Sequence, residues 1–269
     1  MNIFELETNA NKIRKNIINM LAEAGSGHTA GSLDIVEILV SLYFKILKHD
    51  PKNPKWEDRD RLVLSAGHLA PALYATLAEV EYFPKEELLT LRKLNSRLQG
   101  HPHNHSLPFI EASSGPLGQG SSVAVGMALA DKMDKKPNHT FCIVSDGEHN
   151  EGQIWEALMF ASKNKLNNLT FIVDRNHIQI DGTTEEIMPL EPFAKKYEAF
   201  NWNVIEVDGH DFTEILSAFD QKSSDNPTVI IAKTIAGKGI PSIENDWHWH
   251  GKTPTKDEAI QAIKELEAK

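Results

Sequence analysis

The chain has 269 residues, of which 41% are hydrophobic and 25% are charged, and its formal net charge at pH 7 is −10. This composition supports the core of one large domain, and the acidic balance argues against a broad nucleic-acid-binding face. The sequence contains neither a run of ~20 apolar residues nor a secretory signal, and it has a single cysteine, Cys142, so we expect a cytoplasmic protein that does not bind membranes.

The first hundred residues are mainly helical in pattern. The predicted elements are a helix over residues 4–24, a second helix over 32–47, a buried strand over 61–65, a helix rich in alanine and leucine, and a helix over 84–94. Gly25 is a helix-ending residue, Ser32 is expected to cap the second helix, and Pro84 is expected to open the last one.

From residue 119 onward, strands and helices alternate regularly. The predicted elements are a helix over 119–133, a strand over 140–145, a helix over 151–163, a strand over 169–174, a helix over 190–200, a strand over 203–207, a helix over 212–222, a strand over 227–233, and a charged amphipathic helix over 255–268. Apolar strands that alternate with helices predict an α/β fold, a doubly wound, mostly parallel sheet with helices on both faces. We expect one domain over residues 1–269, with ligands at the carboxyl ends of the strands.

Two of these strand ends carry oxygen ligands. Asp146 follows the strand at 140–145 and Asn176 follows the strand at 169–174, a separation of 176 − 146 = 30 residues. A crossover helix and a second strand occupy about that length, and a right-handed connection brings both turns to the same sheet edge. Carboxylate, amide and main-chain carbonyl oxygens suit Mg²⁺ or Ca²⁺, and Gly147 lets a phosphate approach the backbone. Either turn alone is an ordinary feature after a strand. Together they predict a site for a divalent metal and a diphosphate.

The segment Ser145-Asp-Gly-Glu148, followed by Asn176-x-Ile178, resembles the thiamine-diphosphate motif, and the chain resembles the N-terminal, diphosphate-binding domain of transketolases. Further matches occur in the family's order, at Gly25-Ser-Gly-His28, Arg59-Asp-Arg61, Leu64-Ser-x-Gly-His68, Gly100-His-Pro102, Gly115-Pro-Leu-Gly-Gln-Gly120, Glu151-Gly152, Ile180-Asp-Gly182, Lys233-Thr234 and His250-Gly251. The sequence departs from the family at Ser145, where glycine is usual.

The resemblance implies a role for each matched position. Thiamine diphosphate would be bound with a metal held by Asp146, Asn176 and the main-chain carbonyl of Ile178. The other cofactor-binding residues would be His68 and Gly147 at the diphosphate, Gly115, Pro116 and Leu117 around the rings, and Glu151. The catalytic residues would be His28 and His101, which face the substrate, and His250, which also lies near the diphosphate; His248 is the alternative to His250.

Two alternatives concern neighbouring residues. In the family, glutamates at the positions of Glu151 and Glu156 meet across a subunit interface, whereas a solvated helix face is an equal expectation for Glu156. The histidines at 101, 103 and 105 alternate along the chain, which would suit zinc only if the segment were extended. Because no cysteine or acidic ligand accompanies them, we favour loop histidines of which only His101 is functional.

The family's pyrimidine-binding domain has no counterpart in this sequence. The resemblance therefore implies that the partner is a C-terminal transketolase subunit, in an α₂β₂ assembly with the cofactor bound between the two chains. The implied activity moves a two-carbon ketol unit from a ketose phosphate to an aldose phosphate. The alternatives are an enzyme similar to deoxyxylulose-phosphate synthase, the α subunit of a 2-oxo acid dehydrogenase, and a non-catalytic cofactor-binding subunit. The histidines His28 and His101 favour ketol transfer over the dehydrogenase.

Overall fold

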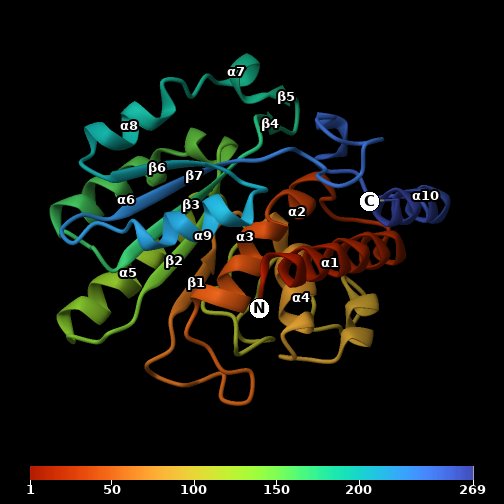
Figure 1. Cartoon of the computed structure of the whole chain (residues 1–269), viewed down its shortest axis with the longest axis horizontal. Helices are drawn as coiled ribbons and strands as arrows, with labels where there is room; N and C mark the ends of the chain where they lie inside the picture. The colour runs from red at the N-terminus through yellow and green to blue at the C-terminus, as the bar shows by residue number, and fades with distance from the viewer. Residues whose placement is uncertain (269) are drawn as a thin grey trace.

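The structure is a computed structural model that describes residues 1–268. Its centre is a parallel sheet of five strands in the order β1-β2-β3-β7-β6. The strands are β1 (Arg61–Leu64), β2 (Thr140–Ser145), β3 (Leu169–Arg175), β7 (Thr228–Lys233) and β6 (Asn203–Asp208). Helices cover both sides of this sheet (Figure 1). The predicted α/β fold is confirmed.

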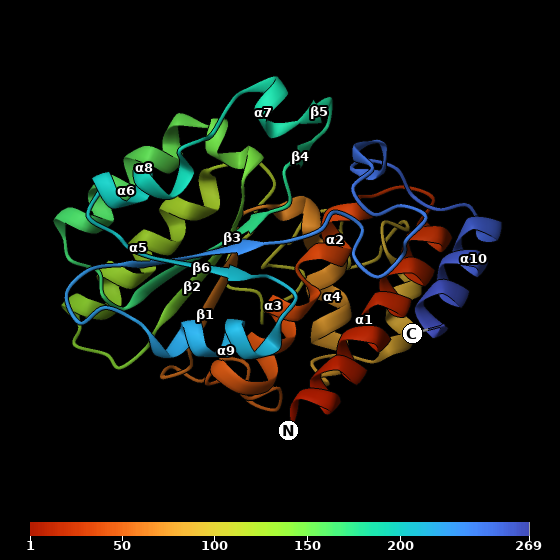
Figure 2. The ribbon, with the colours of Figure 1, turned by 45° about the horizontal axis from the view of Figure 1, so that its top comes forward.

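Alternate strand residues supply two separate cores, because successive side chains of a strand point to opposite faces. Ile143 and Ile172 belong to a core shared with α1 (Ile3–Ala24), α3 (Val36–Ser41), α4 (Ala70–Glu79) and α9 (Phe212–Asp220). Val144 and Val173 belong to a second core shared with α5 (Gln119–Met133), α6 (Gly152–Lys163) and α8 (Phe193–Ala199). The two layers are visible on either side of the sheet in Figure 2. Burial on both faces explains the uninterrupted apolar strands.

The second predicted helix, over residues 32–47, is wrong in its start and is not one continuous helix. The structure has α2 (Ala30–Asp34), then α3, then a π-helical turn over Leu42–Ile46. Ser32 lies inside α2, where its hydroxyl donates to the carbonyl of His28 at 2.7 Å and therefore does not cap the helix. This bond to a carbonyl four residues earlier is a common alternative for a serine hydroxyl.

The helix predicted over 84–94 is also wrong. The structure forms only 3₁₀ turns over Lys85–Thr90. Arg92 and Asn95 have φ angles of 59° and 66°, so the backbone enters the left-handed region and cannot continue a right-handed helix. The resulting loop carries the Arg92 side chain back toward Gly100, the residue that precedes His101.

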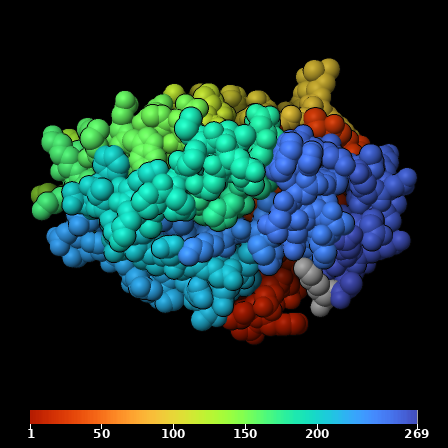
Figure 3. All heavy atoms as spheres, turned by 90° about the horizontal axis from the view of Figure 1, so that it is seen from above, coloured from red at the N-terminus to blue at the C-terminus, as the bar shows by residue number. Residues whose placement is uncertain are grey.

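Between β3 and α8 lies a segment that the sequence pattern does not predict. It contains a short hairpin of β4 (Ile178–Gln179) and β5 (Gly182–Thr183), followed by α7 (Thr184–Ile187). Such short elements have too few residues for a periodic signal. The hairpin packs beside the turn at Trp247–Trp249, which precedes α10 (Lys256–Glu267). Figure 3 shows this segment, in teal, as part of the outer surface next to the blue C-terminal region. No helix within residues 1–268 is long and apolar enough to cross a membrane.

Candidate functional site

The turns that follow β2 and β3 lie against each other, as the sequence spacing predicts. The main-chain N–H of His177 donates to Oδ2 of Asp146 at 2.8 Å, and the main-chain N–H of Gly147 donates to Oδ1 at 2.6 Å. The Asp146 side chain is 1% exposed. Burial raises the pKa of this carboxyl to about 6, although Arg175 and the two N–H groups favour the charged form.

Asn176 is oriented by two buried carboxylates. Its Nδ2 donates to Oδ2 of Asp34 at 2.8 Å and to Oδ2 of Asp174 at 3.1 Å. Both amide hydrogens are therefore used. The two acceptors identify this end of the side chain as nitrogen and the other end as oxygen. The oxygen accepts the N–H of Ile178 at 3.0 Å and keeps a second lone pair free. Burial raises the pKa of Asp174 to about 8, and burial together with the Asp174 charge raises the pKa of Asp34.

Two close backbone approaches and one left-handed glycine bring the glycine-rich loops to this edge. A Cβ on Gly67 would lie 2.8 Å from the main-chain nitrogen of Gly115, and a Cβ on Gly120 would lie 2.6 Å from the Cα of Ser65. Gly118 has a φ of 82° and lies beside the Cβ of Glu151. Glycine is therefore required at these positions by space or by conformation. The predicted ring-lining loop, residues 115–117, consequently lies between the strand ends and the start of α6.

Four histidines from distant parts of the chain form a cluster, which we call the histidine cluster. Its members are His28, His68, His101 and His250. The ring centroid of His28 lies 5.0 Å from that of His68, 5.6 Å from that of His250 and 6.5 Å from that of His101. The His250 ring lies 5.3 Å from the His68 ring. The Cβ direction of Gly115 points at the His101 ring, so the cluster adjoins the loop at 115–117.

His248 lies outside this cluster. Its side chain is 67% exposed, stacks on Trp247 and contacts Asp246 at 2.6 Å. Of the two histidines considered for this position, the structure places only His250 next to His28 and His68. His103 likewise contacts Ser106 rather than the cluster.

Burial favours the neutral form of each ring in the histidine cluster. It lowers the pKa of His28 to about 4, with further contributions from His250 and Arg92, and it lowers the pKa values of His68, His101 and His250. Neutral imidazoles can each donate and accept one hydrogen bond. The Nδ1 atom of His28 is buried and has no hydrogen-bond partner among residues 1–268. An unpaired nitrogen in such a cluster is suited to a polar ligand.

The guanidinium of Arg92 lies close to this cluster. A Cβ on Gly100 would lie 2.7 Å from its Cζ atom, and its charge helps to lower the pKa values of His28 and His101. Arg92 could not be identified from the sequence pattern, because the segment around it looks like an ordinary amphipathic helix. The sequence signal closest to Arg92 is the motif Gly100-His-Pro102, which matches the family but does not include Arg92.

The donor set fits a hard divalent cation with a diphosphate. Within residues 1–268, no three His, Cys, Asp or Glu side chains are arranged to hold a metal by themselves. A cation at this edge would therefore depend on the Asn176 amide and a main-chain carbonyl in addition to Asp146, and it would complete its shell with water or phosphate oxygens. Gly147 has no left-handed φ, and a Cβ there would lie 3.4 Å from Gln179, in ordinary contact.

The start of α6 presents two exposed glutamates beside an apolar surface. Glu151 and Glu156 are both exposed. The helices α5 and α6 also expose residues without polar side chains, which we call the α5/α6 face: Val123, Gly126, Ala130, Met133, Met159 and Phe160. Exposed apolar residues gathered on two neighbouring helices are typical of a protein interface.

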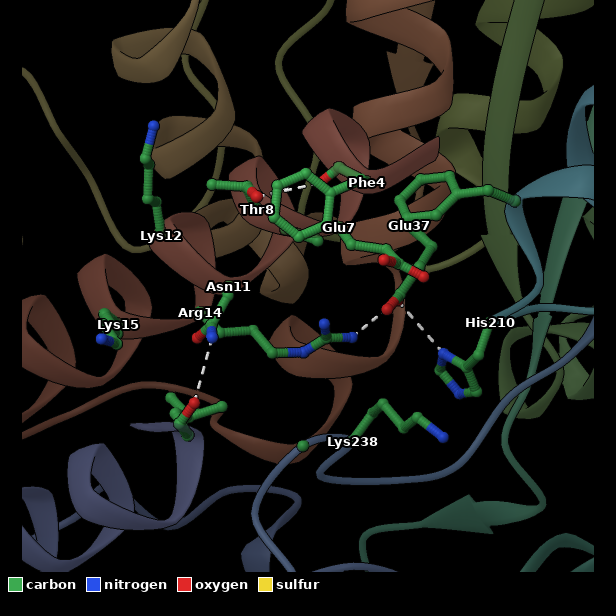
Figure 4. Close-up of a pocket in the computed structure, with 14 residues that line it drawn as sticks. Phe4, Glu7, Thr8, Asn11, Lys12, Arg14, Lys15, Glu37, His210 and Lys238 are labelled. Carbon is green, nitrogen blue, oxygen red and sulfur yellow. Dashed lines mark hydrogen bonds and ion pairs between the residues drawn. The ribbon is translucent and has the colours of Figure 1, made fainter. Parts of the chain in front are cut away.

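A separate hollow of about 560 Å³ lies between α1, α3 and the loop after β7 (Figure 4). Arg14 crosses it and contacts Glu37 at 2.6 Å, and Glu37 contacts Nδ1 of His210 at 3.1 Å. Nε2 of His210 accepts the N–H of Ile235. The hollow contains none of the residues predicted for the site. The buried charges of Arg14 and Glu37 instead hold α3 against α1 and, through His210, against the loop after β7. The contact of Asp34 with Gly237 lies in the same loop.

Known proteins match the chain along nearly its whole length. The model of the family "Transketolase, thiamine diphosphate binding domain" matches residues 6–267. The chain belongs to the transketolase family. It is 46% identical to the 6-deoxy-6-sulfo-D-fructose transketolase subunit SqwG of Clostridium sp. (strain MSTE9), over 98% of this chain and 96% of that protein. It is 40% identical to one of the subunits of apulose-4-phosphate transketolase from Phocaeicola vulgatus, over 99% of this chain and 95% of that protein.

Solved transketolases have the same fold but are longer. The crystal structure of transketolase from Campylobacter jejuni superposes with a TM-score of 0.93 at 35% identity, and the match covers 99% of this chain and 43% of that one. The chain thus corresponds to the N-terminal, cofactor-binding part of a transketolase. Relatives that are separate subunits match nearly end to end, and these are transketolases and not dehydrogenases.

Proposed function

We propose that this chain binds the diphosphate end of thiamine diphosphate through a divalent metal and contributes half of a ketol-transferring active site. The observation that carries the proposal is that the histidine cluster and the abutting turns of Asp146 and Asn176 lie together, because Ala30, two residues after His28, packs against Ile178. Family membership supports the cofactor, since the matching family model is that of a thiamine diphosphate binding domain.

The metal ligands in this proposal are Asp146, Asn176 and the carbonyl of Ile178, with Mg²⁺ favoured over Ca²⁺ because few protein ligands are available. His68 and Gly147 face the diphosphate, residues 115–117 border the rings, and Glu151 closes the site next to Gly118. When bound, thiamine diphosphate supplies a carbon nucleophile that accepts the ketol unit. The residues of this chain bind, orient and desolvate it.

His28, His101 and His250 act on the substrate in this proposal. Transfer of a ketol unit changes the charge and protonation of substrate oxygens, and neutral imidazoles can donate to or accept from such oxygens without first losing a proton. The lowered pKa values of all three favour the neutral ring. The unpaired Nδ1 of His28 is the strongest candidate for direct contact.

In this proposal the other half of the site comes from a C-terminal transketolase subunit. Two relatives of nearly the same length are themselves named as subunits, which supports a separate partner chain. We propose that subunits meet over the α5/α6 face, in an α₂β₂ assembly in which Glu151 and Glu156 approach a second copy. Burial of the exposed Met133, Met159 and Phe160 would supply apolar area for a stable interface.

In this proposal the donor is a ketose with an anionic terminus and the acceptor is an aldose phosphate. The enzyme acts in the cytoplasm. The relatives are named for a sulfonated ketose and for apulose 4-phosphate, which differ in their terminal group and its position. We favour a ketose phosphate as the donor. A sulfonated ketose is the alternative donor, because the chain is 46% identical to SqwG.

The test is reconstitution with the partner subunit, thiamine diphosphate and Mg²⁺. We expect two-carbon transfer from xylulose 5-phosphate and none from pyruvate, and a parallel assay with a sulfonated ketose identifies the donor class. Asp146→Ala should abolish transfer, whereas Asp134→Ala, at an exposed position on the end of α5, should retain it. Full activity of the Asp146→Ala complex would exclude the proposed metal site.

A further inference from the structure

Arg175 occupies the position between Asp174 and Asn176, which the motif leaves open. Its side chain is only 3% exposed. Four acceptors surround it: Asp146 Oδ2 at 3.1 Å and Thr184 Oγ1 at 2.9 Å from Nη1, and Glu185 Oε1 at 3.0 Å and Glu191 Oε1 at 2.9 Å from Nη2. The guanidinium also lies over the Phe193 ring at 5.4 Å. It therefore joins the turn of Asp146 to the segment of residues 184–193.

Arg175 contacts one of the two carboxylate oxygens of Asp146, Oδ2. Oδ2 accepts from both Arg175 and the His177 N–H, whereas Oδ1 accepts from the Gly147 N–H alone among the described residues. Donors on two sides of Oδ2 prevent the carboxylate from rotating. Oδ1 is left with a lone pair for a cation. A partner that fixes the orientation of a ligating carboxylate in this way is a common determinant of metal affinity.

The charges around the guanidinium argue against a simple neutralising ion pair. Asp146, Glu185 and Glu191 contribute three negative charges and Arg175 contributes one positive charge, so the sum is −3 + 1 = −2. A single arginine is therefore shared among three carboxylates, and Glu185 and Glu191 satisfy Nη2.

We infer that Arg175 is a positioning residue for the metal site: it orients Asp146 toward the cation and couples that orientation to Glu191 in the segment before α8. This inference rests on the proposed metal ligand Asp146. It assigns a role to a side chain that the motif does not specify, and Arg175 itself touches neither metal nor substrate.

The test measures metal binding directly. The complex with the partner subunit, loaded with thiamine diphosphate, is titrated with Mn²⁺, and free Mn²⁺ is followed by electron paramagnetic resonance. We expect Arg175→Met to weaken Mn²⁺ binding about 10- to 100-fold. Arg175→Lys keeps the charge but loses the planar fork, so its Mn²⁺ affinity should lie between those of the wild type and Arg175→Met. Equal or tighter binding by Arg175→Met would overturn the inference, since an arginine that merely competed with the cation would give tighter binding.

Two controls separate the possible failures. Arg61→Met removes another poorly exposed arginine, which pairs with Asp131 at 3.1 Å at the opposite, N-terminal end of β1, and should leave Mn²⁺ affinity unchanged. An equal loss of affinity in Arg61→Met would show that general destabilisation is responsible and would overturn the inference. Asp146→Ala should abolish high-affinity binding; if it does not, the proposed metal site fails, whatever the behaviour of Arg175.

Coupling to Glu191 is tested by a double-mutant cycle. Glu191 is exposed, so Glu191→Gln should weaken Mn²⁺ binding only about two- to fivefold. In the Arg175→Met background the same change should have no effect, because its connection to Asp146 is already lost. An effect of equal size in both backgrounds would contradict the coupling.

Discussion

The carboxylate of Glu148 lies 2.7 Å from the main-chain nitrogen of Gly118 and so joins the turn after β2 to the loop before α5. The same side chain accepts the hydroxyl of Ser65 at 2.5 Å and the N–H of Ser145 at 3.1 Å. One buried acid thus connects three strand-end or loop segments around the site. It was part of the matched motif, but its role depends on partners 30 and 83 residues away.

Replacement of this acid by an amide should loosen the site. In Glu148→Gln, one carbonyl oxygen and one NH₂ group face three donors, so at least one buried donor loses its partner. We expect a loss of about 2 kcal/mol in the free energy of unfolding and weaker binding of thiamine diphosphate. Urea unfolding and cofactor titration measure the two effects. Glu86→Gln, at an exposed position, should change neither; equal stability of both variants would contradict the prediction.

Two glycines of α5 should respond in opposite directions to alanine. A Cβ on Gly120 would lie 2.6 Å from the Cα of Ser65, whereas a Cβ on Gly126 would meet nothing within 4 Å. Gly120→Ala should destabilise the chain by about 1–3 kcal/mol through overpacking. Gly126→Ala should stabilise the isolated chain by about 0.5–1 kcal/mol through helix propensity. Chemical denaturation of both variants gives the comparison, and a shift of the same sign would exclude the close approach of α5 to β1.

The two neighbouring histidines near the C-terminus should differ in their effect on activity. His250 lies in the histidine cluster, whereas His248 is exposed and pairs with Asp246. In the reconstituted enzyme, His250→Ala should lower kcat/KM about 100-fold, the lower end of the range for a positioned acid–base group. His248→Ala should remain within about twofold of the wild type, as expected for an exposed pair. The reverse order would identify His248 as the functional histidine.

The sheet and the meeting of the turns that carry Asp146 and Asn176 could be predicted because they depend on local patterns. The strands are short β-branched runs buried on both faces, and the separation of Asp146 and Asn176 reflects one crossover unit. The residues that orient these two could not be predicted in the same way. Asp34 meets Asn176 across 142 residues of sequence, and Arg175 acquires its role from a segment too short to show periodicity. Side-chain partners of this kind are set by tertiary packing.

The helical errors have a related cause. Ser32 is a good capping residue by type, but its hydroxyl bonds within α2 to His28. Pro84 is a good opening residue by type, but the backbone turns left-handed at Arg92. In both cases the chain is directed toward the histidine cluster, through His28 in one case and Arg92 in the other. Tertiary constraints near a site override local propensity there.

Acid should destabilise the fold through His149. This side chain is 1% exposed, its Nδ1–H donates to the carbonyl of Ser145 at 2.8 Å, and its Nε2 accepts the hydroxyl of Tyr197 at 2.6 Å. Burial lowers its pKa from 6.5 to about 4, so only the neutral ring suits the folded state. The unfolded chain binds a proton below about pH 6.5. The resulting contribution to stability is complete above that pH and is lost progressively as the pH falls toward 4.

Between about pH 7.5 and pH 5, this linkage should remove about 2 kcal/mol from the free energy of unfolding. In His149→Gln, a residue that can also donate and accept, this part of the pH dependence should disappear even if the variant is less stable at neutral pH. Urea unfolding at the two pH values gives the slope for each protein. Equal slopes would mean that His149 titrates alike in the folded and unfolded chains, and its burial between Ser145 and Tyr197 would then carry no proton linkage.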